Sequence, residues 1–176
     1  MNDWTNFLRT EAPTLGASQD ADTHITALEH WALMGVQGPD SLKFLQGQLT
    51  CDVSTLSDES STLGAHCTHQ GRILSSFRAF MTNSSDVALA MPVDLYEGAV
   101  QALAKYIVFS KAEITNLSEH YCGIGLQGPE ANALIATHFG QTPPNQNALV
   151  HKDQSFAINL GHDRFECWLP TEDAIK

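Results

Sequence analysis

The feature that most constrains the fold is a short internal repeat, in which an apolar run leads through Gly-Pro into an amphipathic segment. One copy spans residues 34–41 and the other spans residues 124–131. Glycine permits a tight exit from a strand, and proline suits the first turn of a helix, where its missing N–H costs nothing. Each copy therefore predicts a strand that turns directly into a helix packed back on it. We interpret the pair as an old duplication within one fold.

The segment after each Gly-Pro has apolar residues at helical spacing. The first predicted helix starts at Pro39 and ends near Thr50, and Gly140 is placed to end the second. The predicted apolar faces are Leu42, Leu45 and Leu49 in the first helix, and Leu134, Ile135 and Phe139 in the second.

The remaining chain predicts short alternating strands and one further helix. That helix spans Asp94–Phe109, and Asp94 with Glu97 matches a capping box. The predicted strands are residues 26–36, 62–68, 72–81, 87–91, 111–116, 122–127, 156–160 and 165–169. Because most of them are joined by short turns, neighbouring strands pair antiparallel. The sequence therefore predicts an α+β fold of mostly antiparallel sheets with packed helices.

The repeat and the composition together suggest three segments. Residues 1–23 are polar and predict a flexible N-terminal arm with a short helix at residues 3–9. Residues 24–117 and 118–176 form the first and second α+β units. The last residues, 170–176, resemble the first turn of an unfinished helix, so we expect the second unit to be incomplete and the chain to be a piece of a longer protein.

Charge and hydropathy exclude several classes of function. The net charge is −11, from 20 acidic and 9 basic residues, which disfavours a surface that binds nucleic acid directly. The apolar runs are too short to cross a bilayer, and the N-terminus lacks the basic and apolar regions of a signal peptide. We therefore expect a cytoplasmic protein with no membrane partner.

Metal and nucleophile chemistry find little support in the sequence. The densest group of metal-binding residue types is His66–His69, where Cys67 and His69 share a strand face and His66 points away. A zinc site needs three or four converging ligands, so we predict no metal site. The four cysteines form no CxxC pair, and we expect reduced, mostly buried thiols. We assign no catalytic residue.

Two features could bind a ligand. Trp31 lies in a predicted strand, where it could belong to the core or form a flat wall on which an aromatic ligand stacks. Four bases, Arg72, Arg78, Lys105 and Lys111, fall in the middle of this acidic chain. They could line an anion-binding cleft or lie on solvated faces, and the residues alone leave both alternatives open.

The chain resembles the YgfZ family, folate-binding regulators of tRNA modification that are related to the T-protein of the glycine cleavage system. The resemblance extends from about residue 24 to residue 176. It rests on five runs of residues, which are Trp31–Leu33, Gly38–Val53, Ala65–Cys67, Gly71–Arg72 and Lys105–Lys111. The resemblance implies a GcvT/YgfZ-like folate-binding fold with two related strand–Gly-Pro–helix units.

The resemblance also implies a ligand and partners. The expected ligand is tetrahydrofolate or a derivative, because Trp31 matches a tryptophan that this family uses in folate binding. Arg72, Lys105 or Lys111 would then meet the anionic glutamate tail. The implied function is regulation of tRNA modification and maintenance of iron–sulfur proteins, with iron–sulfur or tRNA-modifying proteins as indirect partners.

Departures from the family patterns matter equally. The family motif KGCYxGQE, with its functional cysteine, is absent. T-proteins carry an acidic pair where this chain has Ser75 and Ser76, and an acid where it has His162. A serine cannot stabilise a developing cation as a carboxylate does. The alternatives to a regulator are a folate-dependent aminomethyltransferase, which the serines disfavour, and a non-catalytic interaction module.

Overall fold

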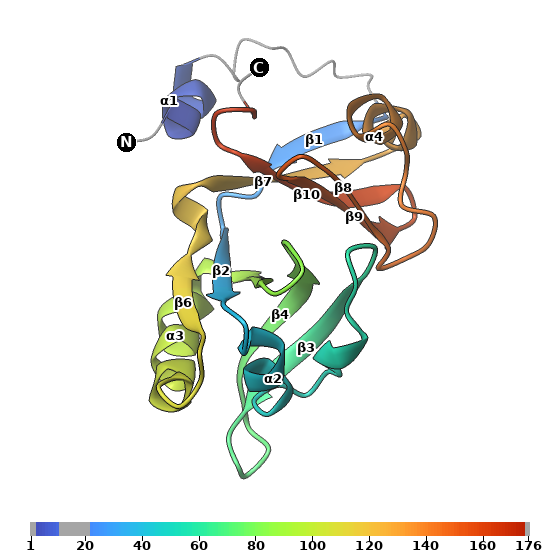
Figure 1. The fold of residues 1–176 in the computed structure, drawn as a ribbon. Helices are drawn as coiled ribbons and strands as arrows, with labels where there is room; N and C mark the ends of the chain where they lie inside the picture. Colours follow the sequence, from blue (N-terminus) through green and yellow to red (C-terminus); the bar gives the residue numbers. More distant parts are fainter. Residues whose placement is uncertain (1–2, 11–21, 175–176) are drawn as a thin grey trace. The chain divides into compact units, whose positions relative to one another are not determined.

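The structure, a computed structural model, describes residues 3–10 and 22–174. The chain divides into two compact units that alternate along the sequence. Unit 2 comprises His30–Glu119 and Asn147–Leu149, and unit 1 comprises Met1–Glu29, His120–Gln146 and Val150–Lys176. Each unit contains one five-stranded sheet (Figure 1).

The sheet of unit 2 has the order β3-β4-β5-β2-β6, and every pairing in it is antiparallel. Its strands are β2 (Trp31–Gln37), β3 (Ser61–Cys67), β4 (Ile73–Met81), β5 (Val87–Pro92) and β6 (Glu113–Asn116). The helical segments are α2 (Ser41–Gln46), η2 (Val53–Thr55), α3 (Val93–Ile107) and η3 (Leu117–Glu119). β3, β4 and β5 form the predicted antiparallel meander, and β2 has a neighbour on both sides.

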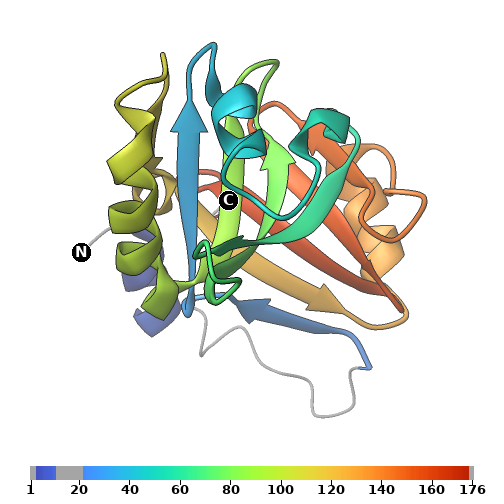
Figure 2. The same cartoon turned by 90° about the horizontal axis from the view of Figure 1, so that it is seen from below.

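The core of unit 2 lies between one face of this sheet and the two helices α2 and α3 (Figure 2). Strand alternation directs Met34 and Leu89 to this face, where they meet Leu45 from α2 and Leu103 from α3. These four side chains are at most 1% exposed. Burial of apolar side chains of this size stabilises a fold by about 2 kcal/mol each.

Unit 1 is built on the same plan. Its sheet has the order β1-β7-β10-β9-β8, with α4 packed on one face (Figure 1). The elements are α1 (Asp3–Thr10), β1 (His24–Ala27), β7 (Tyr121–Gln127), α4 (Ala131–Phe139), β8 (Leu149–Lys152), β9 (Ser155–Gly161) and β10 (Arg164–Pro170). Ala131, Ile135 and Phe139 form the buried face of α4, and Gly140 ends the helix with φ 78°.

The two Gly-Pro junctions have the same local geometry. Gly38 and Gly128 both have positive φ, 119° and 126°, and each is packed against backbone of another segment. A Cβ at Gly38 would lie 2.6 Å from the carbonyl oxygen of Lys111, and one at Gly128 would collide with the carbonyl oxygen of Asp22. In both copies only glycine fits, because the φ and the close approach exclude a side chain.

β2 and β7 are the strands that lead into the two Gly-Pro junctions. The short strand that precedes each of them in the chain pairs with the other one. β1 precedes β2 in the chain but pairs with β7. β6 precedes β7 but pairs with β2. The two copies therefore exchange their edge strands. The sheet of unit 1 takes β1 from a distant part of the chain, whereas the strands of the unit 2 sheet, β2 to β6, follow one another in the chain.

Several sequence-based boundaries were wrong in detail. The predicted strand 26–36 is two strands in different sheets, separated at residues 28–30. The first of them, β1, pairs with β7 in the sheet of unit 1, and only the second, β2, belongs to unit 2. The first Gly-Pro helix begins at Ser41 and ends at Gln46, well before Thr50. Leu134 is 42% exposed and does not belong to the buried face of α4.

The capping box was also wrong, because Pro92 is the N-cap of α3 and Asp94 lies in its first turn without a capping hydrogen bond. An acid there still interacts favourably with the helix dipole. The four-residue strand β8 was not predicted. The short N-terminal helix is present as α1, whereas the rest of the expected flexible arm, residues 11–21, lies outside the described residues, as do residues 175–176 of the expected final helical turn.

Candidate functional site on the Trp31 face of unit 2

The face of the unit 2 sheet opposite α2 and α3 carries the sequence-predicted Trp31, and we call it the Trp31 face. Leu33 lies opposite Ala90, which in turn lies opposite Arg78, so these side chains share this face. Continuing the same register places Ser76 level with Trp31. Trp31, Ser76 and Arg78 therefore project from one surface, on β2 and β4.

Trp31 begins β2 and is paired with Pro92, the last residue of β5. Its side chain is half-buried, unlike the fully buried Leu33 on the same strand. The ring of His30 meets the indole edge-on, with centroids 6.3 Å apart and planes at 67°. Because part of the indole remains accessible, Trp31 is not an ordinary core residue.

Arg78 is a buried cation, only 7% exposed. Its Nη1 donates hydrogen bonds to Ser61 Oγ at 3.0 Å and to Asn147 Oδ1 at 2.8 Å. Ser61 Oγ donates in turn to the Asn147 carbonyl oxygen at 2.9 Å. Asn147 has φ 69° and belongs to the short segment 147–149 that joins unit 2 from a distant part of the chain. Arg78 thus fixes this segment to β3 and β4.

Ser75 and Ser76, which the resemblance sets against an acidic pair, point to opposite faces of the sheet. Ser76 is exposed, on the Trp31 face. Ser75 is 1% exposed and lies opposite His66 on the helix-covered face. His66 is 5% exposed, its Nδ1 has no hydrogen-bond partner in the described part of the chain, and burial lowers its pKa. The imidazole is therefore held neutral.

The three bases predicted to meet an anionic tail do not gather around Trp31. Arg72 is exposed in the turn between β3 and β4. This turn extends past the same end of the sheet as the one that carries Trp31. Lys105 lies twelve residues along α3 from its start, about 18 Å along the axis. Lys111 follows α3, and its N–H donates to Asp40 Oδ2 at 2.8 Å while its side chain is exposed. Two of the three predicted bases thus lie toward the opposite end of the sheet.

The four cysteines are free thiols. Cys122 and Cys167 are buried, and burial raises the pKa of each to about 12. Burial also raises the pKa of the half-buried Cys51. A thiol is nucleophilic as the thiolate, so these three cysteines are inert at neutral pH.

Within residues 3–10 and 22–174 there is no cluster of three metal-ligating side chains. No helix in the same residues is long and apolar enough to span a membrane.

Comparison with known proteins then identifies the family. The family model described as the GCVT N-terminal domain matches residues 21–156. The chain belongs to this family. It is 34% identical over 166 residues to the tRNA-modifying protein YgfZ of Pectobacterium carotovorum subsp. carotovorum, with 93% of this chain and 49% of the relative covered. It is 38% identical over 133 residues to the protein of the same name from Vibrio atlanticus, with 76% and 40% covered. The resemblance to YgfZ proteins is therefore confirmed, and the chain spans about half the length of these relatives or less.

Solved structures agree on the fold. The glycine cleavage system aminomethyltransferase T of Bartonella henselae superposes with a TM-score of 0.76 at 22% identity, covering 88% of this chain and 44% of that protein. The heterotetrameric sarcosine oxidase of Corynebacterium sp. U-96 gives a TM-score of 0.54 at 13% identity, covering 86% and 77%. The predicted α+β, GcvT-like architecture is confirmed.

Sequence reasoning assigned Trp31 to the candidate site but missed two neighbours on its face. Ser76 entered only as a missing carboxylate, and Arg78 only as one of four bases. Alternation along β4 could have placed both on one face. Their alignment with Trp31 depends on the pairing of β5 with β2 and β4, which no local pattern reveals.

Proposed function

We propose that this chain is a tetrahydrofolate-binding regulatory protein of the YgfZ type, which acts in tRNA modification and the maintenance of iron–sulfur proteins. The observation that carries the proposal is the match to relatives named tRNA-modifying protein YgfZ, combined with a half-buried tryptophan at the position expected for folate binding. We expect it to act in the cytoplasm.

The residues on the Trp31 face fit a flat aromatic ligand. A partly accessible indole offers a surface for stacking, and the exposed Ser76 beside it offers a hydroxyl that donates and accepts hydrogen bonds. Bound tetrahydrofolate would supply one-carbon carrier chemistry. Arg72 remains a candidate for the glutamate tail, whereas Lys105 and Lys111 are weaker candidates than the sequence suggested, because they lie toward the other end of the sheet.

Tryptophan fluorescence tests the ligand. Trp168 is buried and donates from Nε1 to Glu166 Oε1 at 2.7 Å, so the responsive candidates are Trp31 and Trp4. Titration with tetrahydrofolate should quench the fluorescence saturably. Trp31→Phe should abolish that signal, and the matched control Trp4→Phe should retain it. Absence of saturable quenching in the unsubstituted chain would contradict folate binding.

A second experiment tests the cellular role. We expect expression of the chain in a bacterium lacking its own YgfZ protein to raise the content of modified nucleosides in tRNA, measured by mass spectrometry. Trp31→Phe should lower this effect at equal protein level. Folate binding without any change in tRNA would separate the ligand from the proposed role.

Aminomethyl transfer is the second candidate, because a T-protein superposes on this fold. Neither serine can supply the carboxylate that the T-protein comparison requires, since Ser75 is buried and Ser76 bears only a hydroxyl. We expect no transfer of a glycine-derived one-carbon unit in a reconstituted glycine cleavage assay. Activity above the background without the chain would favour this candidate.

A further inference from the structure

A hollow of about 210 Å³ lies on the sheet of unit 1, in a part of the chain that the proposed function does not use. Of the four polar side chains that line it, three come one from each of three adjacent strands. His24 on β1 lies opposite Gln127 on β7, and Gln127 lies opposite Arg164 on β10. Directly opposite residues share a face, so the three form one row across the sheet.

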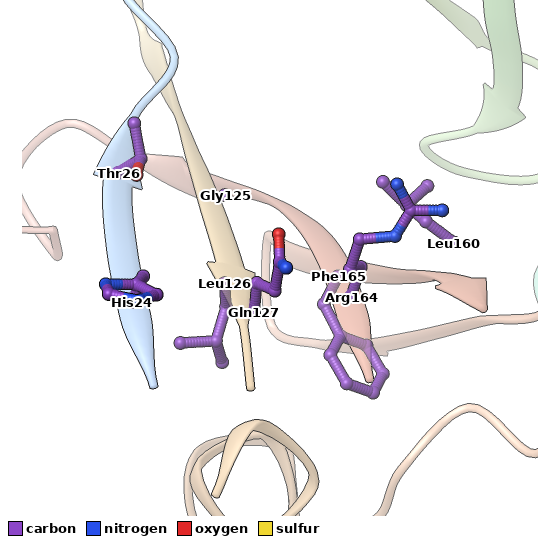
Figure 3. Close-up of a pocket in the computed structure, with 8 residues that line it drawn as sticks. All are labelled: His24, Thr26, Gly125, Leu126, Gln127, Leu160, Arg164 and Phe165. Atoms are coloured by element: carbon purple, nitrogen blue, oxygen red, sulfur yellow. The ribbon is translucent and has the colours of Figure 1, made fainter. Parts of the chain in front are cut away.

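The row faces away from α4. Leu126 and Phe165, which alternate with the row, point to the other side of the sheet and belong to the core formed with α4. Figure 3 shows Gln127 and Arg164 pointing away from these two apolar side chains. The other residues that line the hollow are Thr26, Gly125, Leu126, Leu160 and Phe165, and Gly125 contributes no side chain to fill the space.

The chemistry of the lining is unusual for so acidic a protein. Its polar side chains among the described residues are His24, Thr26, Gln127 and Arg164. All four can donate hydrogen bonds, and no carboxylate from residues 3–10 or 22–174 lines the hollow. The chain as a whole has 20 acidic and 9 basic residues. Glu166, two residues along β10 from Arg164, is buried and accepts a hydrogen bond from Trp168.

Arg164 is held in place while its charged end stays available. Its Nε donates to the carbonyl oxygen of Gly161 at 3.3 Å, which anchors the guanidinium near the hollow. Among the residues that the structure describes, its two terminal nitrogens, the His24 ring and the Gln127 amide make no hydrogen bond. A fork of two N–H donors beside further hydrogen-bond donors suits an oxyanion.

We propose that this hollow is a binding site for a small oxyanion, carried either by a phosphate or by a carboxylate. Arg164 supplies the charge and a bidentate contact. Gln127 and His24 donate further hydrogen bonds along the same row. All residues of this site belong to unit 1, whereas the Trp31 face belongs to unit 2.

The test is a titration of the isotopically labelled chain with inorganic phosphate and, separately, with succinate, at constant ionic strength set by sodium chloride. We expect saturable chemical-shift changes at the Arg164 Nε–H and the Gln127 side-chain amide, with a dissociation constant on the order of 1 mM. The anion that binds more tightly identifies the chemical source.

Two substitutions remove the same charge from unit 1 at different places. Arg164→Gln should weaken binding about tenfold, the usual loss for a hydrogen bond to a charged group. Lys152→Gln, on the strand at the other edge of the sheet, should leave it unchanged. Arg164→Lys, which keeps the charge but not the fork, should give a loss of affinity between those of the other two variants.

Trp31→Phe should have no effect on anion binding, so failure of the folate proposal would leave this one intact. Linear shifts, or equal losses in the Arg164 and Lys152 variants, would overturn the site.

Discussion

At the scale of single residues, His66 makes folding sensitive to acid. Its folded-state pKa is lowered by burial, so the unfolded chain binds a proton at His66 more readily than the folded chain does. The contribution to stability is therefore fully present above the unfolded pKa of about 6.5 and is lost as the pH falls below it. We predict that the free energy of unfolding decreases as the pH is lowered from about 7.5 to about 5.5, and that His66 accounts for part of this decrease.

Urea denaturation of His66→Leu at both pH values checks this prediction. The leucine variant should lose the His66 part of the pH dependence, whatever its own stability. The exposed neighbour provides the control, because His69→Leu should keep the full dependence of the unsubstituted chain. An unchanged dependence in His66→Leu would contradict the prediction.

Arg78 offers a second prediction at this scale. Arg78→Ala leaves Asn147 Oδ1 without its donor and opens a cavity beside Ser61. We expect a loss of about 3 kcal/mol in the free energy of unfolding, as for other broken buried charge networks. Arg72→Ala removes the same charge from an exposed turn and should change stability by less than about 0.5 kcal/mol. Equal effects of the two variants in thermal denaturation would show that Arg78 is not structural.

At the scale of elements, two glycines with positive φ separate backbone strain from steric collision. Gly140 has φ 78° and free space around it, whereas Gly38 has φ 119° and lies against the Lys111 carbonyl. Gly140→Ala should therefore destabilise by about 1 kcal/mol, the strain alone. Gly38→Ala should lower the free energy of unfolding by clearly more than Gly140→Ala, because the strand-to-helix junction must move to make room for the methyl group. Chemical denaturation of both variants measures the difference, and equal losses would contradict it.

How far the sequence predicts the fold depends on whether the signal is local. Alternation and turn residues were sufficient for the β3–β4 hairpin and the β9–β10 hairpin, and the four-residue period was sufficient for α3. The break between β1 and β2 was missed because no glycine or proline marks a turn at residues 28–30, although the two strands belong to different sheets. β8 was missed because its four residues, Leu149–Lys152, are too few for a period to be recognised.

Prediction of the candidate site was likewise limited to what local sequence signals show. Trp31 was identified through the family resemblance and lies where a ligand could reach it. Lys105 and Lys111 lie within one of the runs that carry the resemblance, but α3 leads the chain away from Trp31 before it reaches them. The row of His24, Gln127 and Arg164 joins three distant parts of the chain, and only strand register brings it together.

At the scale of the whole molecule, the exchange of edge strands makes the two repeats depend on each other. β7 has β10 on one side and β1 on the other. Residues 118–176 alone would lack β1 and leave the backbone groups of β7 unpaired along a sheet edge, which favours aggregation. Residues 30–119 keep all five strands of their sheet but lack Asn147, the partner of Arg78.

We therefore predict different behaviour for three fragments. Residues 30–119 should fold with reduced stability, because only one hydrogen-bonding segment is missing. Residues 118–176 should be poorly ordered, and fusing residues 22–29 through a flexible linker to the end of that fragment should restore the antiparallel β1–β7 pair and the dispersion of its amide spectrum. The linker must be long enough to span the sheet. A second fusion, with the same linker and with residues 22–29 in scrambled order, is the control for the effect of the added length. If residues 118–176 fold as well without β1 as with it, the exchanged strand is not what holds this unit together.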